Sequence, residues 1–192
     1  MTNLPCILFA GGKSSRMGED KTLLPFGGYD TLCEYQYRRL QKIFSNVYIS
    51  TKNPQKFSFD AEFILDKSDT YAPTAGFAAI YENLDAERFF VLGVDMPFVD
   101  EKVILPLLHA DDAKKDATLA LSHNGVESLC GIYHRSLQPC FEDMLAKGEH
   151  KLRKLLDSVD TVLVPFENEA AFLNLNRPQE YQKAKELYDI IY

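Results

Sequence analysis

The feature that most constrains the fold of this chain is a regular alternation of short apolar runs with amphipathic segments. The first run, Leu4 to Ala10, is almost continuously apolar and stops at Gly11-Gly12. That pattern is typical of a β-strand buried on both faces of a sheet. The same reasoning predicts further strands at residues 46–51, 61–65, 88–94, 117–121, 129–133 and 161–166.

Segments with helical spacing of apolar residues lie between most of these runs. They predict helices at residues 31–44, 74–84, 101–110, 137–148, 150–159 and 177–192. Thr74 is a candidate helix cap, and Gly148 is a candidate helix stop. Strands that alternate with helices indicate an α/β fold with a mostly parallel central sheet flanked by helices. Because no linker-like segment interrupts the 192 residues, we expect one domain over residues 1–192.

The bulk properties exclude several classes of function. A net charge of -7 argues against a general binder of nucleic acids or membrane surfaces, since both need a broad basic face. No apolar stretch approaches the roughly 20 residues of a membrane helix, and no basic segment precedes the first apolar run. The cysteines form no C-x-x-C pair and are expected to be buried free thiols in a reducing cytoplasm: Cys6, Cys33, Cys130 and Cys140.

The loop after the first strand has the residues of a phosphate site but neither standard pattern. A P-loop requires a glycine at position 7, where this chain has Ile7, and a dinucleotide-binding loop does not place Gly11 beside Gly12. The two glycines still permit a close backbone approach, and Arg16 and Lys21 bring cations to an acidic chain. Loop residues of secondary interest are Lys13, Ser14 and Ser15. The alternative interpretation is a glycine-rich turn with solvated charges.

Ligands of α/β sheets bind beyond the carboxyl ends of the strands, so polar residues at those ends are candidates. Asp95 follows the strand at 88–94, and a carboxylate there suits Mg²⁺, which prefers few protein oxygens beside phosphate and water. Asp66 and Asn53 follow two other strands. Each has a structural alternative: a turn for Asp95, a strand-end cap for Asp66 and an Asn-Pro turn for Asn53.

The segment Ala10-Gly11-Gly12-x-Ser14-x-Arg16-Met17-Gly18-x-Asp20-Lys21 resembles the signature of nucleotidylyltransferases with the glycosyltransferase-A-like fold. It is most similar to the molybdenum cofactor guanylyltransferases, with Phe9 where that family usually has Leu. Residues 66–76, 93–98, 128–133 and 172–181 resemble later motifs of the family, so the resemblance covers almost the whole chain. It implies a Rossmann-like sheet that carries one nucleotidyltransferase site.

The resemblance also implies a reaction and a set of site residues. GMP would pass from GTP to the terminal phosphate of molybdopterin, with Mg²⁺ as cofactor and pyrophosphate as the second product. The implied catalytic residues are Arg16, Lys21 and Asp95, and Asp95 would be the metal ligand. The implied nucleotide-binding residues are Phe9, Ala10, Gly11, Gly12, Lys21, Asn53, Asp66 and Asp95. Asn174 and Asn176 would meet the pterin; alternatively, Asn176 caps the last helix.

Three other functions stay open at this point. The chain could be a molybdopterin cytidylyltransferase, a sugar-phosphate nucleotidylyltransferase or a nucleotide-binding regulator without catalysis, because the guanine choice rests on resemblance alone. The expected partners are GTP and molybdopterin, with transient contacts to other molybdenum cofactor biosynthesis proteins. We expect a cytoplasmic monomer or weak homo-oligomer that contacts neither nucleic acid nor membrane.

Overall fold

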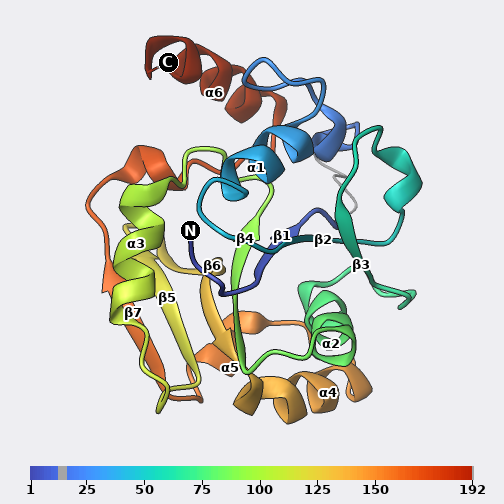
Figure 1. Ribbon diagram of the computed structural model, residues 1–192, viewed down its shortest axis with the longest axis vertical. Helices are drawn as coiled ribbons and strands as arrows, with labels where there is room; N and C mark the ends of the chain where they lie inside the picture. The colour runs from blue at the N-terminus through green and yellow to red at the C-terminus, as the bar shows by residue number, and fades with distance from the viewer. Residues whose placement is uncertain (13–16, 192) are drawn as a thin grey trace.

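One seven-stranded sheet forms the centre of the computed structural model, which describes residues 1–12 and 17–191 (Figure 1). The strand order is β3-β2-β1-β4-β6-β5-β7. The strands are β1 (Cys6–Phe9), β2 (Val47–Thr51), β3 (Glu62–Leu65), β4 (Arg88–Gly93), β5 (Ala117–Ser122), β6 (Gly125–His134) and β7 (Thr161–Pro165). Every strand that the sequence predicts is therefore present, although several are shorter by a few residues.

The sheet is mostly parallel, as predicted. Strands β3, β2, β1 and β4 run parallel to one another, and β5 runs parallel to β7. The exception is β6, which is antiparallel to both β4 and β5. The reversal occurs because only two residues, His123 and Asn124, separate β5 from β6, and a two-residue connection joins antiparallel strands alone.

The helices also match the predicted segments, with different bounds. They are α1 (Leu32–Leu40), α2 (Pro73–Asn83), α3 (Glu101–Ala110), α4 (Gln138–Ala146), α5 (Leu152–Leu156) and α6 (Pro178–Ile191). The prediction that Thr74 caps a helix is wrong, because α2 already begins at Pro73, a residue suited to the first helical position. Gly148 does follow the end of α4, with φ +67°.

Two hydrophobic cores cover the two faces of the sheet (Figure 1). Helices α1, α3 and α6 contribute to one core, and α2, α4 and α5 contribute to the other. All four cysteines are free, as expected, and Cys6, Cys33 and Cys130 are buried, but the expectation of burial is wrong for Cys140, which is only partly buried. Burial raises the pKa of the Cys33 thiol to about 12, so that thiol stays protonated and unreactive at neutral pH.

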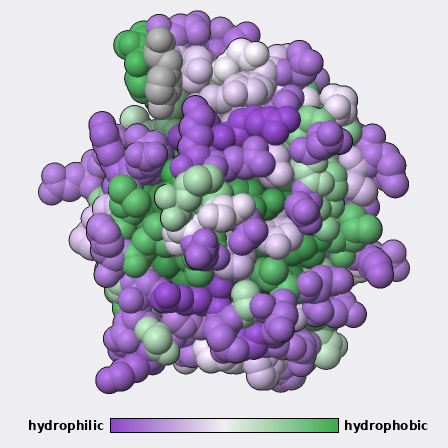
Figure 2. Space-filling model, viewed as in Figure 1, coloured by the Kyte–Doolittle hydropathy of each residue, from purple (hydrophilic) through white to green (hydrophobic). Residues whose placement is uncertain are grey.

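The face of the molecule seen in the view of Figure 1 is predominantly polar. Figure 2 shows a face on which hydrophilic residues predominate, with hydrophobic residues gathered mainly across its middle. Among the described helices, none has both the length and the apolar character needed to span a bilayer.

Candidate active site

The candidate site lies where β1 and β4 end side by side. In the register of these parallel strands Phe9 is level with Gly93, and the Val94 amide donates to the Phe9 carbonyl at 3.0 Å. The glycine turn after β1 and the Asp95 loop after β4 therefore leave the sheet at the same edge. This is the edge at which ligands of parallel α/β sheets bind.

Lys21 is the side chain that joins three distant parts of the chain at this edge. Its Nζ donates to Oδ2 of Asp95 at 2.7 Å and to Oδ1 of Asn176 at 2.9 Å. These partners lie 74 and 155 positions further along the sequence. The Lys21 side chain is 12% exposed and that of Asp95 20%, so both charges are largely shielded from water. Shielding strengthens their interaction with each other and with any phosphate beside them.

Asp20 holds the turn on which Lys21 sits. Its Oδ1 accepts from the Thr22 amide at 3.0 Å, which caps the 3₁₀ turn Lys21–Leu23, and its Oδ2 forms an ion pair with Lys56 at 2.7 Å. Partial burial acts to raise the pKa of Asp20, but the hydrogen bonds from Lys56 and Thr22 outweigh it, so the pKa lies below its ordinary value. The ionised form of Asp20 is thus favoured by the fold.

Asp95 presents a single carboxylate at this edge of the sheet. A β-carbon added to Gly93 would lie only 2.7 Å from Oδ1 of Asp95, so the glycine leaves the space that this carboxylate occupies. The described residues contain no group of three or more His, Cys, Asp or Glu side chains that could hold a metal. A lone carboxylate suits Mg²⁺, which takes most of its oxygens from phosphate and water, better than zinc, which takes three or four protein ligands.

Asp66 lies at the far wall of the same pocket. Its Oδ2 pairs with Lys52 at 2.9 Å, and its Oδ1 accepts from the Ser68 amide at 2.9 Å. Lys52 Nζ also lies 5.1 Å from the centre of the Tyr71 ring. Asp66 therefore caps the end of β3, as the alternative interpretation from the sequence predicted, and it also lines the pocket. The two interpretations of Asp66 are compatible.

Neither Asn53 nor Asn174 is among the residues that line the pocket of Lys21 and Asp95. Asn53 lines an adjoining pocket with Ala10, and its Oδ1 accepts from the Gln55 amide at 3.1 Å, as an Asn-Pro turn requires. Asn174 donates through Nδ2 to the Phe172 carbonyl at 3.2 Å, within its own segment. Asn176, in contrast, accepts a hydrogen bond from Lys21 through its side-chain oxygen. The backbone amide of Leu175, the residue between Asn174 and Asn176, donates to the Asp95 carbonyl at 2.9 Å.

The structure thus brings most of the predicted residues to one pocket. The predicted residues that line it are Phe9, Gly11, Gly12, Lys21, Asp66 and Asp95. Arg16, with Lys13, Ser14 and Ser15, lies outside the described residues. Sequence reasoning did not assign a role to Lys52 or Lys56, although the position of Lys52 directly after β2 was an available signal. The ion pair between Lys56 and Asp20 had no signal, because it joins separate loops.

Known proteins are similar to this chain over most of its length. The chain matches the family described as "MobA-like NTP transferase domain" over residues 6–162. A protein of Campylobacter jejuni subsp. doylei, named molybdenum cofactor guanylyltransferase, is 38% identical over 187 residues, which cover 96% of this chain and 97% of the relative. A protein of the same name from Helicobacter pylori is 32% identical over 191 residues, which cover 96% and 93%.

A solved structure shows the same fold. It is the molybdopterin-guanine dinucleotide biosynthesis protein A of Archaeoglobus fulgidus, with a TM-score of 0.81 and 24% sequence identity. The superposition covers 98% of this chain and 100% of the other. At that identity the likeness establishes the arrangement of helices and strands.

Proposed function

The chain belongs to the MobA-like NTP transferase family, and on this premise we propose that it is a molybdenum cofactor guanylyltransferase acting as one domain over residues 1–192. It transfers GMP from GTP to the terminal phosphate of molybdopterin and releases pyrophosphate. The observation that carries the proposal is the convergence of Lys21, Asp95 and Asn176 in one hydrogen-bonded group beside the glycine turn.

The pocket walls suit the parts of GTP. The Gly11-Gly12 turn carries no side chains, so its backbone can come close to the triphosphate. Lys21 donates to phosphate oxygens and stabilises the charge that develops on the transferred and leaving groups. Arg16 is the second cation proposed for the phosphates. Asp66, which lines the same pocket, and Asn53, which lines an adjoining one, are the residues proposed to meet the nucleoside.

Asp95 is the residue proposed to hold Mg²⁺. When bound, the ion neutralises phosphate oxygens and the departing pyrophosphate. The attacking phosphate of molybdopterin is already an anion, so the protein need not supply a strong general base. The residues contribute by orienting the reactants and by balancing negative charge. Asn176, which accepts from Lys21, and Asn174 of the same segment are the residues proposed to meet the pterin.

The decisive measurement is pyrophosphate release with GTP, CTP or ATP, each with and without molybdopterin, together with transfer of radiolabel to the pterin. We expect release with GTP only, and only when molybdopterin is present. Equal or better use of CTP would make the chain a cytidylyltransferase, and use of a sugar 1-phosphate in place of molybdopterin would point to that class. GTP binding without any release of pyrophosphate would indicate a regulator and overturn the proposal.

A further inference from the structure

A glutamine with no exposed surface lies directly behind the Asp95 loop. Gln36, in the middle of α1, is 0% exposed and sits among core residues such as Leu32 and Leu40. A buried amide is costly unless its polar atoms are hydrogen-bonded. Gln36 Nε2 donates to the Met96 carbonyl at 2.9 Å and lies 3.4 Å from the Val94 carbonyl. The glutamine therefore contacts the backbone on both sides of the proposed metal ligand.

Arg39, one turn further along α1, continues this contact. Its Nη1 donates to Oε1 of Gln36 at 3.0 Å and also to the Pro97 carbonyl, and its Nη2 donates to the Val99 carbonyl at 2.9 Å. The guanidinium carbon of Arg39 lies 5.1 Å from the centre of the Tyr35 ring, and this contact restrains the plane of the guanidinium group. Both Nη atoms of the guanidinium donate to acceptors within the protein, two of which are backbone carbonyls of the loop. This geometry suits a residue that supports the loop rather than one that binds substrate.

Together the two side chains contact four carbonyls of the loop, those of residues 94, 96, 97 and 99. The carbonyl of Asp95 itself is taken by the Leu175 amide from the C-terminal segment. The loop is thus held from α1 on one side and from the segment that carries Asn176 on the other. Because the backbone is restrained in this way, the Asp95 carboxylate stays in one position and loses little conformational entropy when a ligand binds.

We propose that Gln36 and Arg39 are positioning residues that hold the Asp95 carboxylate toward Lys21 and the substrate phosphates. The inference rests on the proposed function for what Asp95 binds. It adds that part of the site's accuracy comes from the face of α1 that contacts the loop of residues 94–99. A glutamine and an arginine that hold this loop do not touch the reacting atoms, so they act through Asp95.

The test compares Gln36→Met, which keeps the volume and removes the amide, with the wild-type protein. The first readout is hydrogen exchange of the peptide that covers residues 94–99, which we expect to quicken at least about tenfold. The second is Mn²⁺ affinity in the presence of a non-hydrolysable GTP analogue, followed by the electron paramagnetic resonance signal of free Mn²⁺, which we expect to weaken about fivefold or more. In turnover we expect a lower kcat with a nearly unchanged KM for GTP.

Arg39→Lys is the second variant and keeps the positive charge while removing the fork. It should shift the same readouts in the same direction if hydrogen bonding to the loop is what matters. Should Gln36→Met fail to fold, Arg39→Lys decides the question. Wild-type values for Arg39→Lys would mean that the charge alone matters, and the positioning role of Arg39 would be wrong.

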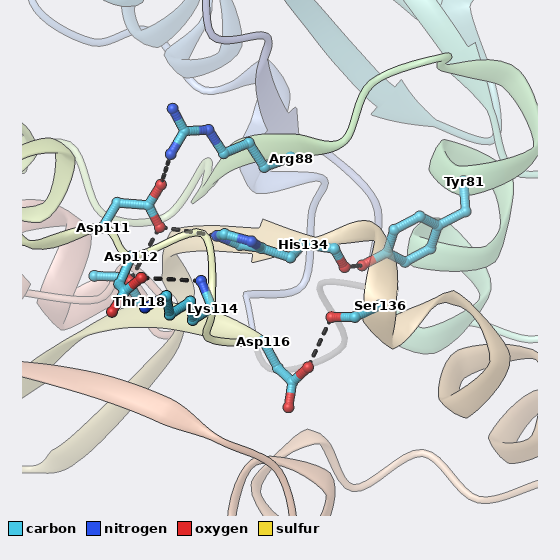
Figure 3. A network of polar contacts seen from close by, with 9 residues as sticks. All are labelled: Tyr81, Arg88, Asp111, Asp112, Lys114, Asp116, Thr118, His134 and Ser136. Carbon is cyan, nitrogen blue, oxygen red and sulfur yellow. Dashed lines mark hydrogen bonds and ion pairs between the residues drawn. The ribbon is translucent and has the colours of Figure 1, made fainter.

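The matched control is Tyr81→Phe, whose hydroxyl donates to the His134 carbonyl (Figure 3). His134 pairs with Arg88 at the start of β4, so this contact lies at the end of the sheet opposite Asp95. The control substitution also removes one buried side-chain donor from a backbone carbonyl, at 2.8 Å. We expect lower thermal stability with unchanged Mn²⁺ affinity. The proposal is overturned if Gln36→Met keeps wild-type exchange and Mn²⁺ affinity, or if Tyr81→Phe weakens Mn²⁺ binding equally. A wild-type protein that binds no Mn²⁺ would refute the metal assignment, while the exchange result would still decide the positioning role.

Discussion

Single residues in this protein act through neighbours that hold them. Lys21 carries its ammonium group on a flexible stem, and the position of that group depends on the Asp20 cap and on two acceptors, Asp95 and Asn176. An ammonium held in this way can meet a phosphate oxygen without first losing much side-chain entropy. The residue scale is therefore where the chemistry of the proposed transfer is most easily disrupted.

Replacing Lys21 by Met should remove the charge and keep most of the packing. We expect kcat to fall about 10²- to 10³-fold, because a pre-positioned donor to developing negative charge is lost. Steady-state pyrophosphate release measures this, and circular dichroism checks the fold. Lys183→Met, an exposed substitution on α6, is the control and should keep full activity. A Lys21→Met enzyme with wild-type turnover would refute the assigned role.

The lowered pKa of Asp20 predicts a pH-dependent contribution to stability. Because the folded state favours the ionised carboxylate, the contribution is present above the unfolded pKa of about 3.9 and is lost as pH falls through the lower folded pKa. The pair with Lys56 is partly exposed, so we expect about 1 kcal/mol or less at neutral pH. Thermal unfolding of the wild-type protein and Asp20→Asn between pH 3 and pH 7 should show the Tm gap narrowing as pH falls. A gap that widens in acid would contradict this sign.

At the scale of elements, the ends of the strands matter more than their middles. Strand β4 ends at Gly93, and the missing β-carbon there leaves room for the Asp95 carboxylate. The turn between Phe26 and Tyr29 uses glycine differently, because Gly27 and Gly28 both have positive φ in a two-residue hairpin. Glycine is thus needed for space at Gly93 and for backbone conformation at Gly27 and Gly28.

These two uses of glycine can be separated by experiment. Gly93→Ala should displace the Asp95 carboxylate and lower kcat/KM at least about tenfold. Gly28→Ala has open space around it and a φ of +80°, so we expect a loss of about 1 kcal/mol in the free energy of unfolding from backbone strain, with activity kept. Urea unfolding and pyrophosphate release on both variants make the comparison. Equal activity in the two variants would show that the space beside Gly93 is not needed.

For the whole molecule, the two cores stabilise the fold and the edge of the sheet carries the site. Phe44 is 1% exposed and stacks on Phe90 with ring centres 5.2 Å apart, at the end of the sheet opposite Asp95. The polar network of Asp111, His134 and Arg88 lies at that same opposite end (Figure 3). Stability and chemistry are therefore supplied by different regions.

Phe44→Ala tests this separation. Removing a buried aromatic ring should lower the free energy of unfolding by about 3–5 kcal/mol, a large share of the roughly 5–15 kcal/mol typical of a domain. At a temperature where the variant stays folded, we expect kcat and KM close to wild type. Urea unfolding supplies the stability, and pyrophosphate release supplies the rates. A large loss of kcat in the folded variant would show that the core and the site are coupled.

The sequence alone determined the parts of this protein that depend on near neighbours. The apolar run before Gly11-Gly12 predicted a buried strand, the strands and helices followed in the right order, and polar residues after strand ends marked one edge of the sheet. Local patterns sufficed because strand burial, helix periodicity and turn chemistry are set within a few residues. Lys21, Asp66 and Asp95 were selected in this way, whereas Phe9, Ala10, Asn174 and Asn176 came from the family resemblance.

Only the tertiary structure decided which of these parts meet. Lys21 meets partners 74 and 155 positions away, and Gln36 contacts the backbone of the Asp95 loop, because of how the helices and the sheet assemble. A buried glutamine in an otherwise apolar helix face has no local signature, since its partners are carbonyls about 60 residues away. Long-range hydrogen bonds of this kind form because burial leaves polar groups no water to bind, and the folded chain supplies the partner.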